Sequence, residues 1–181
     1  MKTVIVYESM FGNTEHIARK VANGLQQSGN RTVLADVREV GPDDLTGSDL
    51  LVVGAPTHAF SLSRKSTRED AVRQGADASR AAFGVREWLT TLEAAFPVSA
   101  GRPQVAVFDT RVEKVRRLPG SAAKRAAKVL RSYGFDVLDG PTSFYVADVQ
   151  GPVTFGEFDR AREWGARLLQ LVDRQRTRDA S

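Results

Sequence analysis

A short apolar segment that leads directly into a small polar loop constrains this 181-residue chain more than any other feature. Residues 3–7 (TVIVY) are β-branched and almost wholly apolar, as expected for a strand that helices cover on both faces. After the loop 9–14, the apolar residues of 14–27 recur at three- and four-residue spacing, which predicts a helix. Free N–H groups and the positive end of a helix dipole meet in a loop of this kind. The loop is therefore predicted to bind an anion.

The residue types of the loop suit a phosphate. Ser9 and Thr14 carry hydroxyl donors, and Gly12 allows the backbone to approach a ligand closely. Asn13 can cap the helix or donate from its amide. The Gly-Lys P-loop pattern and the Gly-x-Gly-x-x-Gly pattern are absent, which disfavours nucleoside triphosphates and NAD bound in the Rossmann manner. Ordinary turn and cap residues remain the alternative explanation of the loop.

The rest of the chain alternates strand-like and helix-like segments. Further strands are expected at 31–37, 50–54 and 104–108, with an interrupted last strand at 135–138 and 142–146. Helices are expected at 83–96, at 121–133 and from 155 onward. This order predicts an α/β fold with an open parallel sheet wrapped on both faces, whose ligands lie beyond the carboxyl ends of the strands. A loop is expected to begin at Pro56, and a polar turn at Asp109.

One long segment does not fit this alternation. Residues 61–80 are rich in Ser, Arg, Asp and Ala and lack a clean apolar period, so they predict an exposed insertion or lid with at most a helical turn at 68–74. No repeat or linker is visible, so residues 1–175 are expected to form one domain. Residues 176–181 are expected to be a frayed tail.

The amino-acid composition excludes several kinds of active site. Because the chain has no cysteine and only two histidines, it excludes disulfides, thiolate nucleophiles, iron–sulfur clusters and cysteine- or histidine-rich metal sites. No metal is expected, and any redox chemistry must come from a bound cofactor. No apolar run approaches the roughly 20 residues that cross a bilayer, and no signal peptide is recognisable. A cytoplasmic location is the resulting expectation.

Residues 6–15 (VYESMFGNTE) and 53–58 (VGAPTH) together resemble the flavodoxin family. The resemblance implies a three-layer α/β/α, doubly wound, five-stranded parallel sheet with strand order 2-1-3-4-5. It also implies non-covalently bound FMN, whose phosphate the first loop holds and whose ring the next two loops bracket. Carried over position by position, the first loop contributes Ser9, Met10, Phe11, Gly12, Asn13 and Thr14, the second Pro56, Thr57, His58, Ala59 and Phe60, and the third Asp109, Thr110 and Arg111.

Two residues of the second loop could act on a flavin ring. Phe60 can offer an apolar face, or it can be an ordinary core aromatic. His58 can hydrogen-bond the ring or lie near N5 as a proton source, whereas a structural hydrogen bond is the alternative. His58 is interpreted as a binding residue, and no side chain is predicted to be catalytic.

The third loop and the expected rim of the site depart from the family pattern. Many flavodoxins have a glycine-rich, aromatic segment where residues 109–117 are polar and basic. The expected rim is basic as well and contains Arg64, Lys65, Arg68, Arg111, Lys114, Arg116 and Arg117. A basic rim suits an acidic redox partner protein or NAD(P)H, and a solvated surface is the alternative. Nucleic acid is disfavoured because a single-strand site would interleave aromatic residues with the basic ones.

These observations predict an FMN-binding redox protein that transfers electrons through the flavin. An electron carrier and an NAD(P)H-dependent FMN oxidoreductase both remain open. The alternative is a binding or interaction module that keeps the fold but has lost productive FMN binding.

Overall fold

The computed structural model describes residues 1–181 except 27–28, 97–100 and 180–181. Five parallel strands form the sheet: β1 (Lys2–Tyr7), β2 (Arg31–Asp36), β3 (Leu50–His58), β5 (Gln104–Val112) and β6 (Thr142–Val146). They lie in the order β2-β1-β3-β5-β6, and the two-residue strand β4 (Ser61–Leu62) pairs antiparallel with β3 beside this path. Counting the parallel strands alone, the order is 2-1-3-4-5. The predicted fold class is therefore confirmed, with β4 as an addition.

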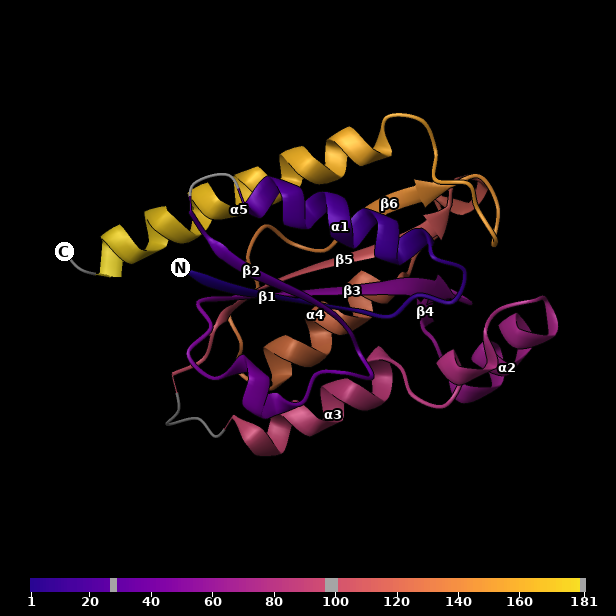
Figure 1. Ribbon diagram of the computed structural model, residues 1–181, viewed down its shortest axis with the longest axis horizontal. Coiled ribbons are helices and arrows are strands. Elements are labelled where there is room, and N and C mark those ends of the chain that lie inside the picture. Colours follow the sequence, from indigo (N-terminus) through magenta and orange to yellow (C-terminus); the bar gives the residue numbers. More distant parts are fainter. Residues whose placement is uncertain (27–28, 97–100, 180–181) are drawn as a thin grey trace.

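Helices cover both faces of this sheet (Figure 1). Helices α1 (Asn13–Leu25) and α5 (Glu157–Asp179) lie on one face, and α3 (Val85–Ala95) and α4 (Ala122–Ser132) lie on the other. Successive strand residues point to opposite faces, so Ile5 packs in the core beneath α1 and α5 while Val4 packs in the core beneath α3 and α4. Short 3₁₀ helices lie at η1 (Pro42–Leu45), η2 (Ala78–Arg80) and η3 (Glu113–Val115).

Helices α1 and α5 pack backbone against backbone. A Cβ atom at Gly24 would lie 2.0 Å from the Arg162 carbonyl oxygen, and one at Gly165 would lie 2.3 Å from the Val21 carbonyl oxygen. No side chain fits at either position, so glycine is required there for close approach. The two helices consequently form one layer whose spacing depends on two glycines.

Two strands extend further than the sequence predicted. The loop expected at Pro56 begins later, because β3 continues through His58, where it pairs with β4. The polar turn expected at Asp109 is instead the buried end of β5, which pairs with β6 from Phe108 to Val112. Tertiary pairing thus overrides local polarity at both strand ends.

The segment predicted as an exposed insertion is folded. It contains β4, helix α2 (Lys65–Arg73) and η2, and α2 lies at the end of the molecule where β3 and β4 end (Figure 1). Arg68, expected on a basic rim, has no exposed side-chain surface. At the C-terminus, α5 continues to Asp179, so residues 176–179 of the predicted tail are helical, and residues 180–181 lie outside the described part. None of the described helices is long and apolar enough to span a membrane.

Candidate functional site

A pocket of about 220 Å³ opens at the carboxyl end of the sheet, where the three predicted loops meet. All predicted site residues line it except Gly12, Phe60 and Asp109. The sequence missed the other lining residues, which are Thr67, Asp70, Ala71 and Gln74 of the α2 region together with Val112, Val146 and Val149. The end of β6 could have been included, since parallel strands end at one edge of the sheet. Helix α2 gave only the signal of a helical turn at 68–74, because just two of its nine residues, Arg68 and Ala71, are buried and show no period.

The first loop presents unpaired donors. Gly12 adopts a φ of +89° at the start of α1, and the first helical hydrogen bond runs from the His16 amide to the Gly12 carbonyl at 2.9 Å. Among the described residues, the amides of 9–15 donate to no protein acceptor. The Ser9 hydroxyl is buried and has no partner in this described part either. Since buried donors in folded proteins are normally satisfied, this cluster indicates an anionic ligand.

A hydroxyl pair joins the first loop to the third. The Thr14 and Thr110 Oγ1 atoms lie 2.7 Å apart in a buried position, so one of them donates to the other. Asn13, which the sequence offered as a helix cap, makes no capping bond, and its amide packs beside Gly151. The loop is therefore connected to two neighbouring segments of the sheet's carboxyl edge.

The insertion encloses the first loop from the side. Met10 packs with Ala71 and Ala76 in a small apolar cluster. Arg80 donates from Nη1 to the Ser9 carbonyl oxygen at 2.7 Å, and Gln150 donates from Nε2 to the Gln74 carbonyl at 2.9 Å. Residues 61–80 are thus a wall of the pocket.

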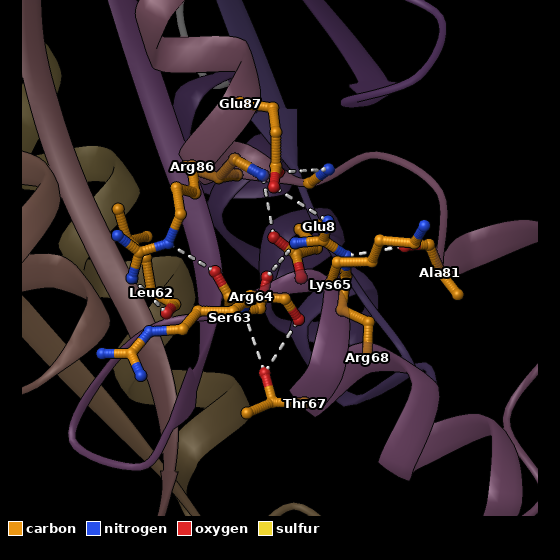
Figure 2. A network of polar contacts seen from close by, with 12 residues as sticks. Glu8, Leu62, Ser63, Arg64, Lys65, Thr67, Arg68, Ala81, Arg86 and Glu87 are labelled. Carbon is orange, nitrogen blue, oxygen red and sulfur yellow. Dashed lines mark hydrogen bonds and ion pairs between the residues drawn. The ribbon is translucent and has the colours of Figure 1, made fainter.

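A buried polar network holds this wall in place (Figure 2). Arg68 donates to the Ala81 carbonyl at 2.9 Å, to Ser63 Oγ at 2.9 Å and to Glu87 Oε1 at 3.0 Å. Glu8, at the end of β1, accepts from the Val85 amide at 2.8 Å. Burial raises the pKa of the Glu8 carboxyl, while the Ser63 hydroxyl, the Val85 amide and the Arg68 charge partly oppose that rise.

Gly84 is the point of contact within this network. A Cβ atom there would lie 2.6 Å from Glu8 Oε2 and 2.7 Å from Arg68 Nη1, so both charged groups rest against the bare backbone. We call the group formed by Glu8, Ser63, Arg68, Gly84 and Glu87 the anchor network. It ties the first strand, the insertion and α3 together directly beneath the first loop.

The second loop is a strained two-residue turn. His58 pairs with Ser61, and the residues between them, Ala59 and Phe60, have φ values of +46° and +63°. Two positive φ angles define a type I′ hairpin, which strongly prefers Asn-Gly, and a phenylalanine in this region is a true outlier. Phe60 is 45% exposed, so it is not a core aromatic. It lies beside Gly120 at the edge of the pocket rather than in its lining.

His58 lines the pocket from the end of β3. Burial lowers the pKa of its imidazole, and the nearby Arg68 charge lowers it further, although the Thr67 backbone partly opposes this. The ring is therefore held neutral at neutral pH and can both donate and accept a hydrogen bond.

The third loop separates into structural and pocket-lining residues. Asp109 faces away from the pocket: its Oδ2 accepts from the Ala123 amide at 2.8 Å at the start of α4. Burial raises the pKa of Asp109, while the Ser121 hydroxyl and the Ala123 amide partly oppose it. Arg111 is buried rather than part of a rim, and its Nη2 donates to the Val115 and Leu118 carbonyls at 2.6 and 3.2 Å. Its Nε has no partner among the described residues.

The geometry agrees with the comparison to a known family. Residues 5–88 match the model of the family described as Flavodoxin. This part of the chain is similar in sequence to the flavodoxin family. The resemblance predicted from the sequence is thereby confirmed, and residues 5–88 contain the first two loops of the pocket.

Solved flavodoxins share the fold over nearly the whole chain. A flavodoxin from the domain Archaea aligns with a TM-score of 0.65 at 20% identity, covering 96% of this chain and 99% of that one. A mutant of the flavodoxin from Pseudomonas aeruginosa aligns at 0.67 and 14%, covering 96% and 99%. Oxidised Flavodoxin 1 from Bacillus cereus aligns at 0.64 and 15%, covering 94% and 98%. No curated protein matches the chain. These likenesses establish a flavodoxin fold for the chain.

Proposed function

We propose that this flavodoxin-like protein binds FMN and transfers electrons through it. The observation that carries the proposal is the set of unsatisfied donors in the first loop, where the amides of 9–15 and the buried Ser9 hydroxyl face a helix N-terminus. A phosphate monoester would satisfy these donors without a cation. When bound, the flavin supplies one- or two-electron chemistry, which this cysteine-free chain cannot perform with its own side chains.

The chain's own residues would bind and orient the cofactor. Ser9, Thr14 and the loop amides would hold the phosphate, and neutral His58 and Arg111 Nε offer donors nearer the third loop. No residue of the pocket is proposed as catalytic. Asp109, Gly12 and Phe60 support the site from outside its lining.

The size of the pocket favours a second candidate function, a binding module without productive flavin. Ligand pockets for drug-sized molecules typically measure about 300–1,000 Å³, whereas this one measures about 220 Å³. A flavin would therefore be only partly enclosed by the residues that line the pocket. The two candidates differ in whether FMN binds at all.

Titration of the purified apoprotein with FMN, followed by quenching of flavin fluorescence, tests the proposal. We expect micromolar or tighter binding and a loss of about tenfold or more in Thr14→Val, since a hydrogen bond to a charged group contributes about 1.5–3 kcal/mol. Thr14→Ser should restore most of the affinity because it keeps the hydroxyl. Thr90→Val, an exposed threonine of α3, is the matched control. Absence of binding up to millimolar FMN would leave the binding module as the function.

Steady-state NADPH oxidation by the FMN-loaded protein separates the two redox roles. Turnover that is saturable in NADPH identifies a reductase, and its absence identifies a carrier that exchanges electrons with a protein.

A further inference from the structure

Arginines with and without a carboxylate partner occur both along α5 and near the pocket. Along α5, the side chains of Arg160, Arg162, Arg167 and Arg176 each pair with a carboxylate. Near the pocket, the cations of Arg64, Arg86, Arg117 and Arg125 have no carboxylate within 4.0 Å among the described residues. Within the described part of the chain, no ion pair therefore neutralises these four positive charges near the pocket.

Three of the unpaired guanidinium groups interact with one another. Arg86 folds over β4, where it donates to the Ser63 and Leu62 carbonyls at 2.7 Å each. Figure 2 shows the Arg64 and Arg86 side chains extending to the same side of the insertion. Burial lowers the pKa of Arg86, and the positive charges of Arg64 and Arg125 lower it further. The Glu87 carboxylate acts in the opposite direction, so the repulsion among these like charges is partly offset.

Two exposed apolar side chains neighbour these arginines in the sequence, since Phe60 lies four residues before Arg64 and Leu118 directly follows Arg117. Phe60 is 45% exposed and Leu118 is 47% exposed. The two are connected, because the Phe60 backbone lies against Gly120, two residues beyond Leu118. We call the surface formed by Phe60, Arg64, Arg86, Arg117, Leu118 and Arg125 the basic rim. A group of apolar side chains surrounded by arginines is typical of protein–protein interfaces.

We propose that the basic rim docks an acidic protein that exchanges electrons with the pocket, an inference that rests on the proposed function. Charge complementarity selects the partner: carboxylates would pair with Arg64, Arg86 and Arg125, and an apolar residue would cover Phe60 and Leu118. A protein is favoured over a nucleotide because Arg64, Arg86 and Arg125 do not line the pocket and the apolar residues stand out from the surface. Docking here places the partner at the edge of the pocket, which Ala59 lines immediately before Phe60.

Binding of a fluorescent, glutamate-rich peptide with a central leucine tests the docking surface without any flavin. At low ionic strength, anisotropy should report binding that weakens steeply with salt. Arg64→Glu/Arg125→Glu should reduce the affinity about tenfold or more, and Leu118→Ser should reduce it severalfold. The matched control is Arg31→Glu/Arg174→Glu, which reverses two exposed arginines that also lack a carboxylate within 4.0 Å among the described residues and lie outside the basic rim. Equal losses in both double variants would overturn the proposal.

A second experiment tests the sign of the charge around the bound flavin. Photoreduced, FMN-loaded protein should reduce anionic ferricyanide at a rate that salt lowers, and cationic hexaammineruthenium(III) at a rate that salt raises. Arg64→Glu/Arg125→Glu should diminish or invert this difference while FMN affinity stays unchanged.

Failure of FMN titration counts against the proposed function alone, because the peptide experiment still proceeds on the apoprotein. Tighter binding of NADPH or a single-stranded oligonucleotide than of the peptide, lost in the same double variant, would assign the rim to that ligand and overturn the proposal.

Discussion

The two ends of the pocket are built in opposite ways. Around the first loop, contacts converge from three directions: the anchor network below, α2 at the side and the hydroxyl of Thr110 from the third loop. At the Phe60 edge, a strained turn carries an exposed aromatic side chain, and the nearby Arg64 and Arg86 have no carboxylate within 4.0 Å among the described residues. Strain and unpaired charge persist only where surrounding structure or function maintains them. We therefore interpret the first-loop end of the pocket as the end that anchors a ligand permanently. We interpret the Phe60 edge as the end that exchanges electrons with partners in the surroundings.

Removing the central cation of the anchor network should have the largest effect. In Arg68→Met, Ser63, Glu87 and the Ala81 carbonyl lose their donor, and at about 1–3 kcal/mol for each buried polar group left unsatisfied the total cost is about 3–5 kcal/mol. We expect the free energy of unfolding, measured in urea, to fall by that amount. Arg73→Met, on the same helix but exposed, should change it by less than about 0.5 kcal/mol. A change below about 1 kcal/mol in Arg68→Met would show that the insertion is not anchored by this residue.

Adding one methyl group to the anchor network should have a smaller effect. Gly84→Ala places a Cβ less than 3.0 Å from Glu8 and Arg68, so the network must shift, at a typical overpacking cost of about 1–3 kcal/mol. Urea unfolding and FMN titration should both report the change. Gly101→Ala serves as the control, since nothing lies within 4 Å of the added atom. Equal stability of the two variants would contradict the tight contact at Gly84.

Relieving the strain at the other end of the pocket should raise stability. Ala59→Asn/Phe60→Gly supplies the residues that a type I′ turn prefers, and relief of strained positions is expected to gain about 1–2 kcal/mol. The same variant should bind both FMN and the acidic peptide more weakly. Phe60→Ala separates the two contributions because it removes the ring and keeps the strained backbone. If the double variant is less stable than the wild type, the turn is not strained.

Two buried carboxyls should shape the pH dependence of stability. The pKa values of Glu8 and Asp109 are raised by burial above their ordinary values of 4.5 and 3.8. The folded state therefore holds these protons more tightly, so their contribution to stability is complete below the ordinary values and is lost as pH rises through the raised ones. Urea unfolding across this range should show a decline that is shallower in Asp109→Asn than in the wild type. The exposed Asp43→Asn variant should keep the original slope, and an unchanged slope in Asp109→Asn would contradict the prediction.

The sequence predicted the sheet and the first loop because their signals are local. Five apolar strands and one strand-to-helix loop each carry their own pattern, and the residues near the ends of the strands then meet by topology alone. The insertion could not be predicted in the same way. Its order comes from Arg68, whose partners Ser63, Ala81 and Glu87 are supplied by segments that only the tertiary structure brings together.

The roles of the polar residues at the end of β5 were also beyond what the sequence could predict. Asp109 and Arg111 follow an apolar strand and resemble a ligand-binding turn, yet both are buried. Asp109 supports the start of α4, and Arg111 holds the carbonyls of the following loop. A sequence pattern cannot distinguish a charge that faces a ligand from a charge that satisfies neighbouring backbone groups.

The glycine contact between α1 and α5 couples the packing of these two helices to ligand binding at the first loop. Helix α1 starts at the phosphate loop, and Gly24, near its other end, lies against α5. A ligand that binds only the packed position of α1 must stabilise that packing, and the packing must raise the ligand's affinity by the same free energy. Gly165→Ala, remote from every pocket residue in the sequence, is therefore expected to weaken ligand binding. The C-terminal helix is in this sense part of the binding equilibrium.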